Sequence, residues 1–240
     1  MNKLTVSASP HKHTPITTQK IMLDVLIALV PALTVHEWAH GYIAYKLGDR
    51  TAKLDGRLSL NPLDHIDPVG ALLLLVAGFG WARPVPVNTR NFRKPKRDIA
   101  LTSAAGPIAN FILAFFGVFF YTLSMHICFY FDVPEVTGTV ICWVFYLSAL
   151  YNLGLGLFNL IPLPPLDGSN ILVAFLPQRL AVKYLQLRYY APYIFIGIII
   201  LSRLPLNIDL FAPLNALEDW IFNGFYELCV KMIAPFFEFI

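Results

Sequence analysis

The 240-residue sequence is 57% hydrophobic and only 14% charged, with a net charge of +3. Soluble domains are about half apolar and about a quarter charged. The mean hydropathy of +0.61 therefore excludes an ordinary soluble globule and predicts an integral, multi-pass membrane protein. The basic residues gather in loops such as residues 83–97, a pattern typical of cytoplasmic loops. We therefore expect membrane lipid as a partner and no nucleic acid.

The chain begins with a polar segment, residues 1–20, which is followed by a long apolar stretch from Ile21 to Leu47. That stretch is long enough to cross a bilayer as a tilted helix. Residues 48–67 are polar and loop-like, and the next apolar stretch, from Pro68 to Trp81, is short for a spanning helix. We therefore expect one crossing, followed by a stretch that either spans the membrane or is re-entrant.

Residues 83–92 read RPVPVNTRNF, where alternating prolines and valines predict an extended or edge strand and not a helix. Two apolar segments follow, residues 99–131 and about 139–160, and each is long enough to cross. Small side chains at positions 102, 105, 106 and 109 predict close contact between the first of these helices and a neighbour. The prolines after Leu160 must end the second.

The C-terminal part, residues 171–240, is predicted to form membrane-associated helices. A basic stretch at residues 179–188 precedes an apolar segment at about 189–201, and residues 214–240 mix charged with aromatic side chains. This tail could lie on the interface or cross once more. The predicted fold is an all-α membrane protein, a polytopic transmembrane helix bundle of about five to six segments with a short re-entrant or β-like loop. Residues 21–170 form its core.

The apolar stretch that follows the polar N-terminal segment contains the sequence HEWAH. His36 and His40 are four residues apart, so on a helix their rings project from one face and can share one zinc ion. Glu37 lies about 60° from His40 around the helix axis, close enough to reach a water at the metal without being a ligand. Two histidines bonded to neighbouring helices are the alternative, but such polar groups are costly in lipid without a function.

Asp167 is a candidate third ligand. It follows a proline-rich break at residues 162–165, where the preceding apolar segment leaves the membrane. A carboxylate there can complete a site of two histidines and one carboxylate with a fourth position open. The alternative role is an N-cap for a helix that starts near Ser169, and the two roles could coexist.

Together these motifs resemble the site-2 proteases, the intramembrane zinc metalloproteases of peptidase family M50. The likeness covers most of residues 35–170. HEWAH is similar to the family's zinc motif and NLIPLPPLDG to its third-ligand motif, while NPLDHIDPVG, GWARPVPVN and AGPIAN look like segments of the compact bacterial members. Many relatives have a second glycine after the Asp-Gly pair, where this chain has Ser169, a difference that concerns loop geometry and not the ligand.

The resemblance implies one Zn²⁺ per chain and a general base beside it. The ligands would be His36, His40 and Asp167, and the base Glu37. The implied reaction is hydrolysis of peptide bonds within or near transmembrane segments of membrane-protein substrates, as in regulated intramembrane proteolysis. Transmembrane proteins are the expected substrates, a bacterial inner membrane is the expected location, and homo-oligomerisation stays open.

Other polar residues have two candidate roles each. The resemblance implies that Asn159 holds the substrate backbone beside the metal; binding the carbonyls freed near the proline break is the alternative. His65 and Asp67 could orient the site, although turn-forming hydrogen bonds are the simpler account. Asn110 is expected to hydrogen-bond across to the helix of HEWAH, chiefly as a structural contact.

Charge predicts the orientation. If the basic loops at residues 83–97 and 179–188 are cytoplasmic, Asp167 lies near the cytoplasmic end of its segment, and the two histidines must meet it there. The first crossing then runs inward, which places the N-terminus outside and makes the stretch 68–81 re-entrant. The proline-valine stretch 84–88 would offer its edge to an extended substrate, because its backbone groups are partly unpaired.

Two other functions compete with proteolysis. A transporter or channel could use the same ionisable side chains for ion coupling. A catalytically inactive scaffold could bind transmembrane helices without cutting them. The glutamate inside the histidine motif favours hydrolysis over the first, and the intact set of ligands and base speaks against the second.

Overall fold

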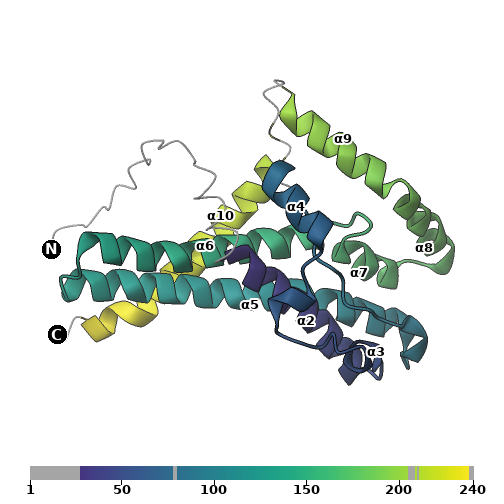
Figure 1. The fold of residues 1–240 in the computed structure, drawn as a ribbon, viewed down its shortest axis with the longest axis horizontal. Helices are drawn as coiled ribbons and strands as arrows, with labels where there is room; N and C mark the ends of the chain where they lie inside the picture. Colours follow the sequence, from purple (N-terminus) through teal and green to yellow (C-terminus); the bar gives the residue numbers. More distant parts are fainter. Residues whose placement is uncertain (1–27, 78–79, 205–208, 210, 238–240) are drawn as a thin grey trace.

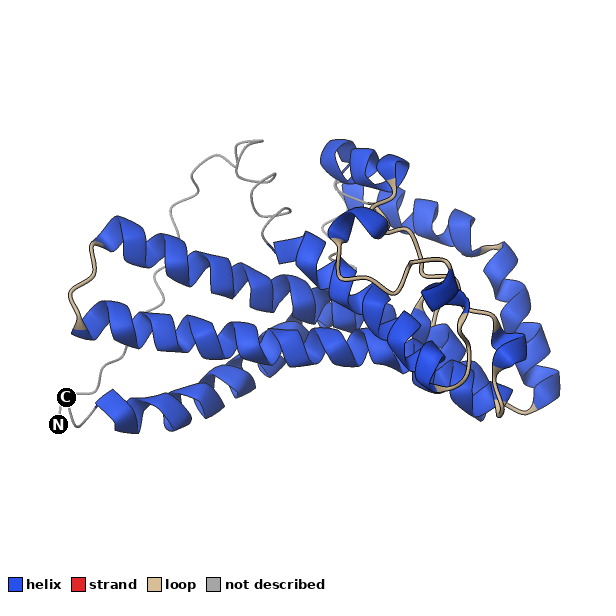
Figure 2. Ribbon diagram, turned by 60° about the horizontal axis from the view of Figure 1, so that its bottom comes forward, coloured by secondary structure: helices blue, strands red, loops and turns tan. Residues whose placement is uncertain are grey.

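The computed structural model describes residues 28–77, 80–204, 209 and 211–237. The described chain is helical (Figure 2) and contains no β-strand within those ranges, so the predicted all-α class is confirmed. The predicted polar segment 1–20 lies outside the described residues. The helices are α2 (Val30–Lys46), α3 (Thr51–Leu54), α4 (Pro68–Ala77), α5 (Pro95–Tyr130), α6 (Glu135–Leu160), α7 (Asp167–Phe175), α8 (Gln178–Leu185), α9 (Ala191–Arg203) and α10 (Ala212–Phe237). Short 3₁₀ turns lie at Pro62–Asp64, Thr89–Asn91 and Gln186–Tyr189.

An antiparallel hairpin of α5 and α6 is the centre of the fold (Figure 1). These two helices, of 36 and 26 residues, are the ones within the described ranges that are long and apolar enough to cross a membrane. They approach closely where Gly117 of α5 meets the backbone of Ala149 of α6, 2.9 Å from where a Cβ would stand. As predicted from the prolines, α6 ends at Leu160.

Helix α10 packs along both helices of this hairpin (Figure 1). Its side chains Cys229, Ile233 and Phe237 form a buried cluster with Val118 of α5 and Ala149 of α6. The tail of the chain is therefore one continuous helix against the hairpin, and its aromatic residues contribute to the core.

The residues that flank the stretch 68–81 on its two sides lie next to each other. Helix α4 has ten residues, about 15 Å at 1.5 Å per residue, which is too short to span. Ile66 and Ala82 form an isolated antiparallel bridge, and the Arg83 N–H donates to the His65 carbonyl at 2.8 Å. The two flanks thus lie side by side, and the extended segment after Ala82 joins no ladder.

Helix α2 lies against the first half of α5, where small side chains allow close approach. Thr102, Ala105 and Gly106 are buried there, as the pattern of small residues predicted. At Gly106 a Cβ would stand 2.5 Å from Nε2 of His40 and 2.6 Å from Cε1 of His36. Two rings therefore occupy the space that any larger residue at 106 would need.

Replacing Gly106 with alanine should destabilise the contact between α2 and α5. Overpacking of a tight core costs about 1–3 kcal/mol, more than the roughly 0.5–1 kcal/mol that alanine gains over glycine in a helix. We expect a melting temperature several degrees below wild type in detergent. Gly224→Ala in α10 is the matched control, because a Cβ there meets nothing within 4 Å. Equal melting temperatures for Gly106→Ala and wild type would show that the rings can yield without cost.

Candidate metal centre

Three side chains converge between α2 and α7. Nε2 of His36 and Nε2 of His40 are 3.0 Å apart, and Oδ2 of Asp167 lies 3.1 Å from the first and 3.2 Å from the second. His36 and His40 are buried, while Asp167 is half-buried. They are the one group of potential metal ligands found among the described residues. The structure thus brings together the three side chains predicted as zinc ligands, and their role as ligands stays a prediction.

The other ring nitrogens of both histidines face oxygen acceptors. Nδ1 of His36 is 2.5 Å from Oδ1 of Asn110, and Nδ1 of His40 is 2.7 Å from the carbonyl oxygen of Thr102. A carbonyl cannot donate a hydrogen bond, so Nδ1 of His40 carries the proton. Nδ1 of His36 also carries a proton, because it faces the side-chain oxygen of Asn110, which can only accept a hydrogen bond. In the neutral rings, the form that binds a metal, both Nε2 atoms then present lone pairs to the space between them.

Asn110 is held so that its oxygen faces His36. Its Nδ2 donates to the Ala32 carbonyl at 3.2 Å and to Oδ1 of Asn152 at 2.8 Å, which fixes the side-chain amide. Asn152 in turn donates to the Ser148 carbonyl at 2.8 Å. The predicted hydrogen bond from Asn110 across to the helix of HEWAH is confirmed. The sequence analysis missed Asn152, although a buried amide inside an apolar crossing segment is itself a signal.

The donor set fits a zinc ion. With both Nδ1 atoms protonated, two nitrogen lone pairs and a carboxylate oxygen face one another in a buried site, and Oδ2 of Asp167 has no donor of its own. Three acceptors at such distances repel unless a cation lies between them. Tetrahedral ligands at about 2.0–2.1 Å from zinc would be roughly 3.3 Å apart, close to the separations observed. Nitrogen and oxygen ligands in this combination are those of catalytic zinc sites.

Glu37 lies beside this group without belonging to it. It lines the same cavity as the two histidines, and its Oε2 accepts a hydrogen bond from the Val85 N–H at 2.9 Å. The extended segment after Ala82 therefore touches the candidate base directly. This position suits a group that exchanges protons with a water at the metal.

The cavity at the site has a volume of about 550 Å³. The extended segment contributes Pro84, Val85 and Val87 to its wall, and α7 contributes Asp167. Asn159 lines it too, with its Nδ2 bonded to the Leu155 carbonyl one turn earlier at 3.0 Å. Among the described residues no hydrogen bond to the Asn159 side-chain oxygen is found, and the predicted role of Asn159 in holding substrate stays a prediction.

Asp167 does not cap a helix. Helix α7 begins at Asp167 itself, and its N-cap residue is Leu166, without a side-chain cap bond. The alternative cap role is therefore not realised. Gly168 is required beside it, because a Cβ there would stand 2.1 Å from the Leu160 carbonyl oxygen. The close approach of α7 to the end of α6 brings the carboxylate to the histidines.

His65 and Asp67 lie outside the site and serve the turn, the simpler of their two predicted roles. His65 is buried, with its Nε2 2.7 Å from the Ser59 carbonyl. Asp67 accepts from the Gly70 N–H at 2.8 Å, and Asn61 accepts from the Leu63 N–H at 3.2 Å. All three fold the chain between α3 and α4.

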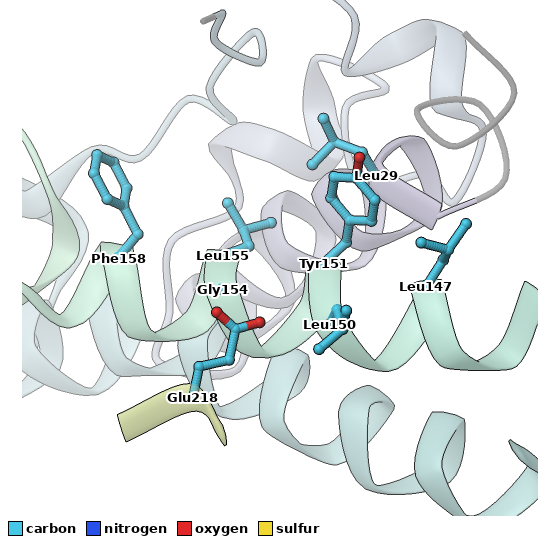
Figure 3. Close-up of a pocket in the computed structure, with 8 residues that line it drawn as sticks. All are labelled: Leu29, Leu147, Leu150, Tyr151, Gly154, Leu155, Phe158 and Glu218. Atoms are coloured by element: carbon cyan, nitrogen blue, oxygen red, sulfur yellow. The ribbon is translucent and has the colours of Figure 1, made fainter. Parts of the chain in front are cut away.

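A second cavity of about 500 Å³ lies on another face of α6 (Figure 3). Its lining is apolar apart from the Tyr151 hydroxyl and the Glu218 carboxylate, which points from α10 toward Gly154. It contains no histidine, cysteine or second carboxylate among its lining residues. It therefore lacks the donors of a metal centre.

Comparison with known proteins identifies the family. The profile of Peptidase family M50 matches residues 127–203, which include Asp167. A Bacillus subtilis protein named "Putative zinc metalloprotease YwhC" is 45% identical over 206 residues, which cover 85% of this chain and 92% of that protein. "Zinc metalloprotease MJ0392" of Methanocaldococcus jannaschii is 28% identical over 155 residues, 65% of this chain and 35% of that protein. No solved structure matches the chain.

The relative from Bacillus subtilis is similar along nearly its whole length, so the match extends well beyond the profile segment. The resemblance first indicated by the motifs is thereby confirmed. The chain belongs to peptidase family M50, the site-2 protease family of zinc metalloproteases.

Proposed function

We propose that this protein is an intramembrane zinc metalloprotease that hydrolyses peptide bonds within or near transmembrane segments of other membrane proteins. In this proposal His36, His40 and Asp167 hold one zinc ion and Glu37 is the general base. The observation that carries it is the convergence of three acceptor atoms, 3.0 to 3.2 Å apart, inside an apolar helix bundle. Acceptors so placed suit a bound cation, and Glu37 would supply the base that hydrolysis needs.

The exposed face of α5 indicates how deep the site would lie in the membrane. Large apolar side chains follow one another along this helix at four-residue spacing and remain 43–54% exposed; they are Ile108, Ile112, Phe116 and Phe120. Such a continuous apolar stripe suits lipid and not water. It begins within one turn of Gly106, which touches both histidine rings. The metal centre would therefore lie within the apolar layer, near its edge.

Charge supports a cytoplasmic orientation of that edge. Thirteen of the 18 lysines and arginines fall in residues 46–57, 83–97 and 179–188. These segments follow α2, precede α5 and include α8, which gather at the same end of the α5–α6 hairpin (Figure 1). The turn at the other end, residues 131–134, has no basic residue. By the positive-inside rule the end with the candidate metal centre would face the cytoplasm, and α4, whose two flanks both lie at that end, would be re-entrant.

When bound, zinc supplies a Lewis acid that polarises the scissile carbonyl and makes water nucleophilic near neutral pH. Glu37 would take the proton from the attacking water and pass it to the leaving amine. Asn110 and Thr102 would keep the two imidazoles in the orientation that directs Nε2 inward. Asn159, in the wall of the same cavity, would donate to or orient the substrate backbone.

The extended segment offers a surface for the substrate chain. Val85 and Val87 line the cavity, and the prolines on either side of Val85 have no N–H to pair. A substrate strand that added to this edge would lie against Glu37, which is already bonded to the Val85 N–H. A transmembrane helix must unwind to present such a strand, so cleavage near the end of a substrate helix is favoured.

Purified protein should contain about one zinc per chain by elemental analysis. His36→Ala, His40→Ala and Asp167→Ala should each lower the zinc content sharply, since each removes one of three ligands. His126→Ala is the matched control, because that ring hydrogen-bonds the Thr122 carbonyl in its own helix, outside the site. Full zinc in the Asp167→Ala protein would remove this residue from the ligand set.

Glu37→Gln should abolish cleavage while leaving zinc bound. The substitution keeps the size of the side chain but removes the base, a loss that typically costs about 10² to 10⁴ in rate. Membrane proteomes of cells with wild-type and Glu37→Gln protein should differ in fragments of the natural substrates, and a reconstituted substrate should give the rate. Glu218→Gln, in the second cavity, is the control that should cleave normally. Wild-type rates from zinc-loaded Glu37→Gln would exclude Glu37 as the base.

A photocrosslinking residue at Val87 should capture substrate in a Glu37→Gln background, since bound substrate would not be released by cleavage. The same residue at Val136, which is 78% exposed at the opposite end of the hairpin, should capture none. Crosslinking at both positions alike, or at neither, would contradict substrate pairing along residues 84–88.

A transporter would show no peptide cleavage in the wild type, and Glu37→Gln would alter ion flux instead. An inactive scaffold would capture substrate and never cut it.

A further inference from the structure

Asp49 is a buried carboxylate that the proposed reaction does not use. It lies in the turn after α2, is 1% exposed, and accepts four hydrogen bonds. Oδ1 accepts from the Thr51 N–H at 3.1 Å, the Thr51 hydroxyl at 2.5 Å and Nδ2 of Asn91 at 2.7 Å. Oδ2 accepts from the Asn88 N–H at 2.7 Å. The two oxygens therefore bind different parts of the chain. Oδ1 is bound mainly to Thr51 at the start of α3, and Oδ2 is bound to the extended segment at Asn88.

The extended segment is fastened at both ends of its cavity-facing part. The Val85 N–H donates to Glu37 and the Asn88 N–H donates to Asp49. On the outer side, Nη2 of Arg57 donates to the carbonyls of Arg83 and Pro84 at 3.0 and 3.4 Å. Between these points no hydrogen bond of the Val87 backbone is found within the described residues. The groups left over are those that a substrate strand could pair with.

Successive backbone groups along an extended chain point to opposite edges. The Val85 and Val87 groups should then share the edge that faces Glu37, and the Asn88 N–H should lie on the edge that faces away. Proline at 84 and 86 removes the donors that would otherwise alternate with it. The Asn88 N–H is consequently the single backbone donor between residues 84 and 88 that can tie the outer edge to the protein.

We propose that Asp49 is a positioning residue for substrate binding: by holding the Asn88 N–H it keeps the Val85–Val87 edge beside Glu37 and the metal centre. This inference rests on the proposed proteolytic function. Asp49 touches neither metal ligand nor substrate, so it would act through the segment that does. Since α2 carries both histidines and ends just before Asp49, the same element sets the position of the metal ligands and of the substrate edge.

The ionisation state of the Asp49 carboxylate agrees with this positioning role. Burial alone would raise the pKa of Asp49, but hydrogen bonds from Thr51, Asn91 and Asn88 outweigh burial and hold the pKa below its usual value. Asp49 is therefore ionised at neutral pH, and its bond to Asn88 is charge-assisted, a class about twice as strong as a neutral one.

Asp49→Asn should keep the hydrogen bonds made by Oδ1 and remove the one made by Oδ2. The amide oxygen should take the Oδ1 position, where three donors converge, which leaves the NH₂ group facing the Asn88 N–H. The bonds from Thr51 and Asn91 stay, and the bond from the Asn88 N–H is lost. Thr51→Ala is the matched control, since it removes the hydroxyl bond at the same carboxylate and leaves the Asn88 bond intact. Asn88→Pro removes the N–H itself, and Asn88→Ala, which like it loses the side chain that accepts from the Arg90 N–H but keeps the Asn88 N–H, is the reference for comparison.

The probe is labelled casein, an unfolded chain, with purified zinc-loaded protein in detergent. Asp49→Asn should raise KM about tenfold or more with kcat within about threefold of wild type, because a misplaced binding edge weakens binding while metal and base remain. Asn88→Pro should do the same, and the double variant should be no worse than either alone. Thr51→Ala should keep the wild-type KM, Asn88→Pro should have a higher KM than Asn88→Ala, and all variants should keep their zinc.

Amide exchange gives a readout that does not need cleavage. Hydrogen–deuterium exchange at residues 85–88 should rise in Asp49→Asn and stay at the wild-type level in Thr51→Ala. An unchanged KM in Asp49→Asn, an equal rise of KM in Thr51→Ala, or unchanged exchange would overturn the positioning role. Failure of the proposed function looks different: the wild type would neither cleave nor capture a substrate, while exchange at residues 85–88 would still report whether Asp49 holds the segment.

Discussion

Two histidine nitrogens and a carboxylate oxygen face one another across about 3 Å in a bundle whose outer surface is apolar. Without a cation this cluster would be among the most unfavourable parts of the molecule, because buried acceptors with no donor are costly and lipid offers no water. Several neighbouring residues serve to hold this cluster together. Gly106 makes room for the rings, Asn110 and the Thr102 carbonyl orient them, and Gly168 lets α7 deliver Asp167.

This arrangement places rigid and adaptable parts in different segments. The predicted ligands and the groups that orient them lie on α2, α5 and α7. Another wall of the cavity is an extended segment that joins no sheet within the described residues and is tied by a few hydrogen bonds. Metal binding needs fixed geometry, whereas a peptide substrate needs backbone groups that are still unpaired. For the proposed function the fold would meet both needs by placing the two side by side.

Sequence reasoning succeeded where the information is local. The spacing of His36 and His40, the proline break after α6 and the small residues of α5 each follow from helical geometry, and Asp167 could be named because acids are rare in that region. The partners of Asp49 could not be found in this way, since they lie 39 and 42 residues further along the chain. Asn152 was missed for a similar reason: its role depends on Asn110, which only the packing of α5 on α6 brings near. The re-entrant stretch was suggested by its length, but its paired ends required the structure.

The bond between Val85 and Glu37 connects substrate binding with the base. One N–H cannot donate two full hydrogen bonds, so a substrate strand that paired at Val85 would take the donor that Glu37 now uses. Glu37 would then be free to turn toward water at the metal at the moment when a peptide bond lies beside it. With the segment empty, the same bond keeps the carboxylate directed at the protein backbone. The extended segment would thus receive the substrate and also hold the proposed base until the substrate arrives. Its proposed anchor at Asp49 would therefore influence a reaction that Asp49 does not touch.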